Sequence, residues 1–194
     1  MRKLSRIVGE ITLSANLLQA TMAGMFWKLI DVDATPEVDS LEDLMSWENH
    51  FVPAEKAYAA WNVIASDATQ RDMMLAVAEV ALKGNPRMLE RVRWIKLKAD
   101  SLGRIRNDAA HLVVDMEYSP RREDGRLVPN QYGMPTKRYK RLQEAKTLES
   151  RFKYVAGDII ALQTYALAVL YQLADPQLRT LPKRPKLRSV PDQR

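Results

Sequence analysis

The sequence predicts an all-α fold: a helical bundle of four to five helices, with a basic loop or small hairpin insertion before the last helix. Apolar residues recur at alternating spacings of three and four along most of the chain, which is typical of amphipathic helices. The chain has no cysteine, so no disulfide framework is expected. Its 194 residues suffice for one core. We expect one bundle domain over residues 1–175, with the insertion at about 115–146.

The first helix is expected over residues 5–30, where one apolar seam runs without interruption. Its members are Val8, Ile11, Ala15, Leu18, Met22, Met25 and Leu29. The following segment, residues 31–52, is acidic and contains Pro36, which predicts a loop with a short helix around residues 40–47. Its acids match the spacing of a calcium-binding loop. Pro36, however, occupies the position that needs glycine, so the sequence favours a plain solvated loop.

Two helices are expected next. Ala57, Trp61 and Ile64 share the apolar face of the first, which begins after Pro53. Ser66-Asp67 then forms a plausible cap for the second, which runs to Gly84 and has Met74, Val77 and Ala81 on its apolar face. Alternatively, the two form one bent helix.

The fourth helix is expected to begin at Asn85-Pro86, a capping residue followed by the residue favoured at the first helical position. Its seam consists of Met88, Val92, Ile95, Ala99 and Leu102. An uninterrupted helix would carry this seam on to Arg106, and an unpaired buried charge is too costly to keep. Either Gly103 therefore breaks or rotates the helix, or Arg106 is partly buried at an interface with an anionic partner.

The remaining chain contains a candidate hairpin, a last helix and a tail. Apolar residues 112–114 and 126–128 flank a turn signal at Asp124-Gly125. A long seam then predicts the last helix, which ends before Asp175-Pro176. The seam consists of Leu148, Phe152, Val155, Ile159, Leu162, Ala166, Val169 and Leu173. Residues 176–194 are basic and rich in proline, and this composition predicts a disordered tail.

Charge is unevenly distributed along the chain, whose net charge is +6. Residues 31–55 hold eight acidic residues and no Lys or Arg, so this region should repel nucleic acid. The balance reverses in residues 119–153, where a polyanion such as RNA is expected to bind. The residues assigned to RNA binding are Arg121, Arg122, Arg126, Lys137, Arg138, Lys140 and Arg141.

The strongest chemical signal is the segment Arg106-Asn107-Asp108-Ala109-Ala110-His111, which holds one of only two histidines. Arginine is a permanent cation that suits phosphate, and imidazole gives and takes protons near neutral pH. On one helix, residues five apart are separated by about 140°, so Arg106 and His111 do not converge within one chain. Asn107 shares a face with His111, Asp108 can reach His111, and Arg104 is the reserve arginine.

This segment resembles the motif of the HEPN (higher eukaryotes and prokaryotes nucleotide-binding) superfamily: arginine, a polar residue, then histidine after four to six intervening residues. The resemblance implies a helical bundle whose two copies bring their motifs together as one metal-independent endoribonuclease site. Arg106, Asn107 and His111 would take the catalytic positions, with Arg104 and Asp108 in reserve.

The expected function is therefore an endoribonuclease of toxin, defence or stress-response type, acting as a homodimer on RNA. A cognate antitoxin or regulatory protein is a further expected partner. The alternatives are a non-catalytic helical module that binds RNA, nucleotide or a protein, and a purely structural dimer.

Two histidines and no cysteine make a metal site unexpected, and no cofactor is expected. The N-terminus lacks a clean apolar run and residues 159–174 are short for a bilayer, so we expect a cytoplasmic protein without a membrane span.

Overall fold

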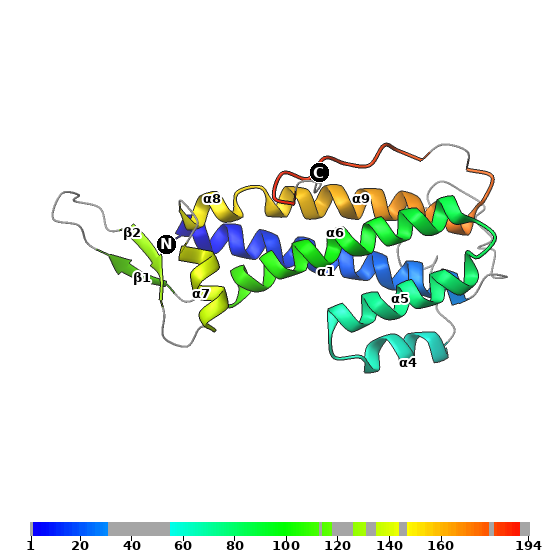
Figure 1. The fold of residues 1–194 in the computed structure, drawn as a ribbon, viewed down its shortest axis with the longest axis horizontal. Helices are drawn as coiled ribbons and strands as arrows, with labels where there is room; N and C mark the ends of the chain where they lie inside the picture. Colours follow the sequence, from blue (N-terminus) through cyan, green and yellow to red (C-terminus); the bar gives the residue numbers. More distant parts are fainter. Residues whose placement is uncertain are drawn as a thin grey trace. The chain divides into compact units, whose positions relative to one another are not determined.

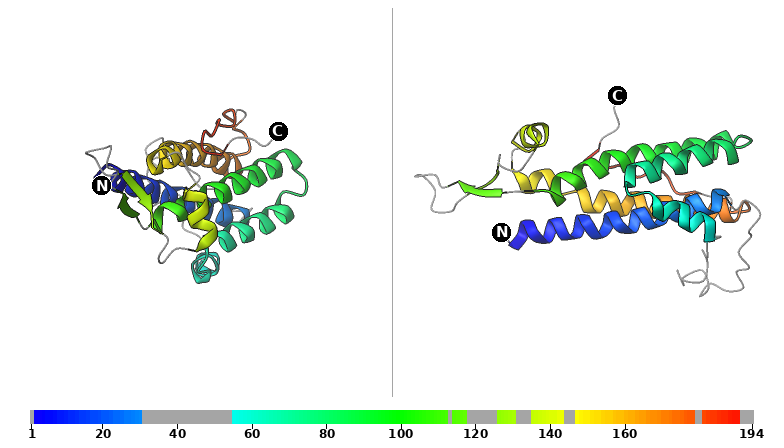
Figure 2. Two further views of the ribbon diagram at one scale, coloured as in Figure 1. Left: turned by 60° about the vertical axis from the view of Figure 1, so that its left-hand side comes forward. Right: turned by 90° about the horizontal axis from the view of Figure 1, so that it is seen from below.

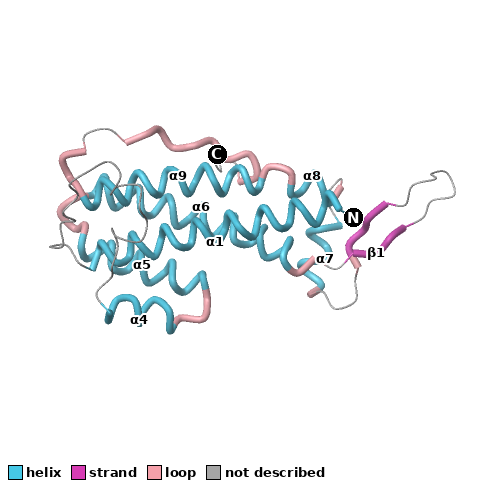
Figure 3. Tube along the Cα trace, turned by 180° about the vertical axis from the view of Figure 1, so that it is seen from behind, coloured by secondary structure: helices cyan, strands magenta, loops and turns pink. Residues whose placement is uncertain are grey.

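The computed structural model of the protein describes residues 2–30, 55–112, 114–117, 126–130, 135–143, 147–178 and 181–190. These residues are predominantly helical, with a two-stranded sheet before the last helices (Figures 1 and 3). The all-α class predicted from the sequence is confirmed. The expected helix at 40–47, the rejected calcium loop and the hairpin turn at Asp124-Gly125 lie outside the described residues.

The chain divides into two compact units, and the expectation of one domain with a tail stays a prediction. The first unit comprises residues 1–16, 101–161 and 186–194, and the second comprises residues 17–100 and 162–185. The boundaries fall within α1 (Arg2–Ile30), α6 (Pro86–Ala110) and α9 (Val155–Ala174), so each of these helices contributes residues to both units. The motif and the basic segment belong to the first unit.

In the second unit, α4 (Glu55–Val63) and α5 (Asp67–Ala81) are separate helices, not one bent helix. Residues 64–66 between them are not helical. The buried Gln70 side chain stabilises this break, because its Nε2 donates to the carbonyls of Trp61 and Ile64 at 2.9 and 3.2 Å. The side chain thereby supplies donors to carbonyls at and just after the end of α4, where the regular helical hydrogen bonds stop.

The core of the second unit contains most of the apolar seams that the sequence predicts, together with Phe26, whereas Ile64, Val77 and Ala81 are only partly buried. Phe26 packs on Trp61 with ring centroids 5.2 Å apart. Gly24 allows α1 to lie close to α9, because a Cβ at this position would come within 3.0 Å of Leu170. Other buried members are Met22, Met25, Leu29, Met74, Val92, Ile95, Leu162, Ala166 and Val169.

Helix α6 begins where the sequence predicts and continues through Gly103. Its first turn is capped by Asn85, whose Oδ1 accepts a hydrogen bond from the Met88 backbone at 3.2 Å. The five predicted seam residues are buried, and Ile105 and Ala109 occupy the next core positions. Arg106 therefore lies half-buried at the flank of the seam. The alternative in which Gly103 breaks the helix is wrong.

The first unit contains the predicted hairpin, drawn clearly in Figure 2. Strand β1 (Val114–Glu117) pairs antiparallel with β2 (Arg126–Pro129), with Val114 opposite Pro129. The first strand thus begins two residues later than the apolar run does. Helix α7 (Thr136–Gln143) follows the hairpin and contacts β2.

The last predicted helix is observed as two, α8 (Leu148–Phe152) and α9, separated by a turn at Lys153-Tyr154. Helix α8 begins with a capping box in which Thr147 and Ser150 exchange side-chain and backbone hydrogen bonds. The seam itself is predicted well, since all its members except Leu173 are buried.

Part of the tail is well packed, contrary to the disorder that its composition predicts. In the first unit, Leu187 is buried, and Asp158 accepts hydrogen bonds from the backbones of Arg188 and Ser189 at 3.1 and 2.6 Å. In the second unit, the Arg184 guanidinium pairs with Glu90 and lies 5.3 Å from the centre of the Trp94 ring. These partners lie far away in the sequence, so composition alone misses them.

Candidate functional site

The candidate site lies on the last two turns of α6, whose regular geometry fixes how its side chains are distributed. Because α6 is uninterrupted to Ala110, Arg104, Asn107 and His111 follow one another at helical spacings of three and four. The backbone N–H of His111 donates to the Asn107 carbonyl at 3.2 Å, which extends the helical pattern by one residue. The sequence expectation that these three residues share a face is met.

All three residues of this face are exposed, and together we call them the open face. Within the described part of the chain, the side chains of Arg104 and His111 make no hydrogen bond or ion pair. The open face therefore offers a cation, an amide and an imidazole to a ligand. These groups can hold a phosphate and transfer a proton.

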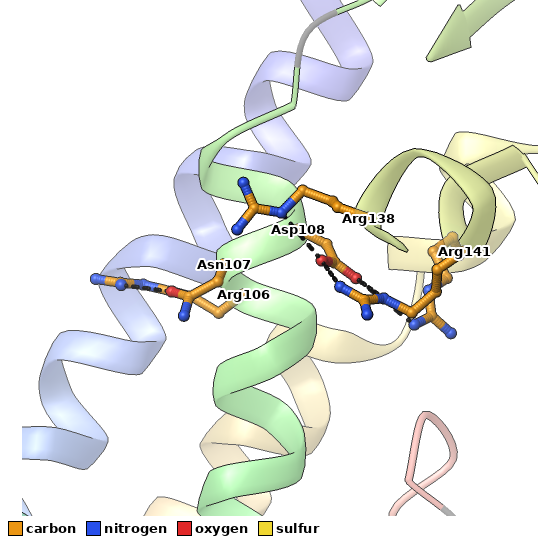
Figure 4. Close-up of polar contacts among 6 residues, drawn as sticks. Arg106, Asn107, Asp108, Arg138 and Arg141 are labelled. Atoms are coloured by element: carbon orange, nitrogen blue, oxygen red, sulfur yellow. Dashed lines mark hydrogen bonds and ion pairs between the residues drawn. The ribbon is translucent and has the colours of Figure 1, made fainter. Parts of the chain in front are cut away.

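Arg106 lies on a different side of α6 from His111, as the helical spacing requires. It is still connected to the open face, because its Nη1 donates to Asn107 Oδ1 at 3.1 Å (Figure 4). Asn107 thus stands between Arg106 and His111. Both arginines remain candidates for phosphate binding: Arg104 by sharing the face of His111, and Arg106 through Asn107.

Asp108 does not play the part expected from the sequence, which assigns it to His111. Its side chain is fully buried and faces α7 and α8 (Figure 4). Arg141 on α7 binds both carboxylate oxygens, with Nε 2.8 Å from Oδ2 and Nη2 bonded to Oδ1. This correction has a physical cause: a buried carboxylate needs cationic partners, and Arg141 offers a two-pronged donor.

Two further arginines surround the same carboxylate. Arg138 Nε lies 3.6 Å from Oδ1 of Asp108, and Arg151 Nη2 lies 3.8 Å from Oδ2. We call Asp108 with Arg138, Arg141 and Arg151 the arginine cluster. Arg151 is absent from the site residues assigned from the sequence. The spacing of three between Arg138 and Arg141 places both on one face of α7, which is the signal that could have predicted a shared acidic partner.

The predicted RNA-binding residues thus separate into different groups. Lys137 and Lys140 on α7 are exposed, and neither pairs with an acid among the described residues. Arg141 binds both oxygens of Asp108, which the sequence does not predict, whereas Arg138 lies 3.6 Å from one of them. Arg126 lies in β2, where its side chain is not described, and Arg121 and Arg122 lie outside the described residues.

The hydrogen bond to Asp108 also raises the pKa of Arg141 above its ordinary value. This cation therefore keeps its charge at every pH at which a protein is ordinarily studied.

The described residues contain no cluster of three His, Cys, Asp or Glu side chains that would suit a metal ion. One helical stretch, Leu148–Ala174, is long and apolar enough to cross a membrane, but core helices often have the same properties.

Comparison of the chain with protein-family models, with curated proteins and with solved structures gives no match. The HEPN resemblance therefore depends on the motif, and the functional argument depends on the geometry of α6 and α7.

Proposed function

We propose that the protein is a metal-independent endoribonuclease whose site is completed in a homodimer. The observation that carries the proposal is the open face, on which His111 and Arg104 are exposed while Asn107 binds Arg106. Lys137 and Lys140 on the neighbouring α7 would hold the RNA backbone through charge. This arrangement agrees with the roles that the HEPN resemblance implies.

In this proposal, His111 takes the proton of a ribose 2′-hydroxyl, and the 2′-oxygen attacks the adjacent phosphorus. The bond from phosphorus to the 5′-oxygen breaks, and the leaving oxygen receives a proton from a second acid. An arginine stabilises the charge that develops on the phosphate. The RNA itself supplies the nucleophile, so DNA should not be cut.

A second copy of the chain would bring together groups that lie apart within one copy. Arg106 and His111 lie on different sides of α6, and a two-fold axis beside the open face would bring the His111 of one copy near the arginines of the other. The same axis would pair each His111 with the arginines of the other copy, so the two pairings in the dimer would be equivalent.

Cleavage of RNA in the presence of EDTA tests the proposed activity. The wild type should give fragments ending in 2′,3′-cyclic phosphate, and His111→Ala should lower the rate at least about 100-fold, because a positioned acid–base group contributes that much. Lys83→Ala, an exposed cation in the second unit, is the matched control and should cleave normally. Intact RNA with the wild type would refute the enzyme and leave the binding module as the better interpretation.

Subunit mixing tests the composite site. His111→Ala should be inactive alone, and so should whichever of Arg104→Ala and Arg106→Ala removes the arginine that stabilises the phosphate. A mixture allowed to exchange subunits should regain activity, because one site in the mixed dimer then has both groups intact. A mixture as inactive as its components, under conditions where mixed dimers are shown to form, would contradict a site shared between copies.

A further inference from the structure

The arginine cluster carries more positive charge than its single acid neutralises. Three guanidinium groups surround one carboxylate, so the cluster keeps a net charge of about +2. Burying this charge without further partners is unfavourable. The side chains of Arg138 and Arg151 are 24% and 30% exposed, so the excess charge is accessible to solvent.

The three arginines are not equivalent. Arg141 occupies both oxygens of Asp108 with hydrogen bonds. Arg138 and Arg151 lie beyond hydrogen-bonding distance of the same oxygens, at 3.6 and 3.8 Å, so each is held by charge alone. Their Nε atoms are buried and have no hydrogen-bond partner among the described residues. Arg141 is therefore the anchor of Asp108, while Arg138 and Arg151 retain unused donors.

The cluster is also next to the open face. Asp108 follows Arg104 by four residues and precedes His111 by three, spacings at which helical side chains are neighbours, with Cβ atoms about 5–6 Å apart. An anion bound at Arg138 and Arg151 would thus lie beside a phosphate held at His111.

We infer that Arg138 and Arg151 form a phosphate subsite for single-stranded RNA, anchored by the Asp108–Arg141 pair and adjacent to His111. The inference rests on the proposed function, because it names the part of the site that holds the neighbouring phosphodiester. One bound phosphate would lower the net charge of the cluster to about +1 and supply acceptors for the unused donors.

The test measures binding of a short single-stranded RNA in which every 2′-hydroxyl is replaced by 2′-methoxy, so that the probe has no nucleophile. Arg138→Ala and Arg151→Ala should each weaken binding roughly tenfold and reduce the slope of log affinity against log salt by about 0.7. Lys83→Ala removes a charge far from the cluster in sequence and should leave both values close to wild type. Thermal unfolding checks that the variants are folded.

If an alanine variant unfolds, Arg138→Lys takes its place: it keeps the charge but loses the forked donor, and should bind the probe several-fold more weakly. Wild-type affinity in the folded variants overturns the subsite.

Calorimetry with inorganic phosphate distinguishes a site for free phosphate from a site for the phosphates of RNA. Phosphate binding that both variants lose, with RNA binding unchanged, would assign the cluster to free phosphate and overturn the RNA subsite.

Failure of the subsite and failure of the enzyme are distinguishable. The probe cannot be cleaved, so its binding does not depend on catalysis. Normal RNA left intact by the wild type refutes the proposed activity even when both arginine variants lose binding. Unchanged probe binding in both variants refutes the subsite even when His111-dependent cleavage is observed.

Discussion

Two adjacent faces of the last turns of α6 differ in what covers them. Asp108 is covered by α7 and α8, and its charge is balanced by arginines distant in sequence. Arg104, Asn107 and His111, within four residues of it, are exposed. The difference shows that a six-residue motif can combine a stabilising residue with residues available for chemistry. Substitutions on the two sides should therefore affect different properties.

The largest effect expected from this comparison is on RNA cleavage, in variants of the two arginines that can stabilise a phosphate bound at the open face. Arg104→Ala and Arg106→Ala each remove one candidate for stabilising the phosphate. Removal of the arginine that does so should lower kcat by about 100- to 1000-fold. The other should have a much smaller effect. Single-turnover cleavage rates, measured with folding checked by circular dichroism, decide between them. Equal, small losses in both variants would remove arginine from the mechanism.

Asp108→Asn should instead reduce stability. The substitution keeps the shape of the side chain but leaves three guanidinium groups without a counter-charge, which we expect to cost about 2–3 kcal/mol of unfolding free energy. Urea unfolding followed by circular dichroism measures the loss. An unfolding free energy within about 0.5 kcal/mol of the wild type would show that the arginines are satisfied by solvent.

Arg141→Lys should cost less, about 1 kcal/mol, because lysine keeps the charge but cannot bind both oxygens at once. Lys140→Arg, the neighbouring exposed position, is the control and should be neutral. Since the hydrogen bond to Asp108 raises the pKa of Arg141 above its already high ordinary value, the guanidinium stays charged and contributes its stabilisation throughout the neutral and mildly alkaline pH range. The difference between the two variants should therefore be the same at pH 7 and pH 9.

The smallest effect is expected for the stability of Asn107→Ala. Its hydrogen bond with Arg106 is exposed, so its loss should change the unfolding free energy by less than about 0.5 kcal/mol. The same urea experiment measures this. A loss comparable to that of Asp108→Asn would mean that the open face is structural, contrary to the comparison above.

The sequence predicts local features of this molecule better than distant contacts. The seam of α6 and the cap at Asn85 follow from residues within a few positions of one another, and both are observed. The exposure of Arg104, Asn107 and His111 agrees with helical spacing once α6 passes Gly103 without a break. The sequence left that question open, because glycine is tolerated within helices as well as at their ends.

What the sequence could not predict depends on partners far along the chain. Helical spacing pairs Asp108 with His111, three positions away, whereas its observed partner, Arg141, is 33 positions away. The packed tail was missed for the same reason, since Asp158 binds backbone groups 30 and 31 residues later. Composition and periodicity contain no information about which distant charges meet.

The pairing of Asp108 with Arg141 has one further consequence. It joins the end of α6 to α7 and thereby closes a loop that contains the β1–β2 hairpin, in a chain that has no cysteine to close it covalently. The entropy of closing a flexible loop depends only weakly on its length, by about 0.6 kcal/mol for each doubling. Changing the length of the hairpin should therefore have little effect on the entropy of closing this loop. Loss of the ion pair between Asp108 and Arg141 would remove the contact that closes it.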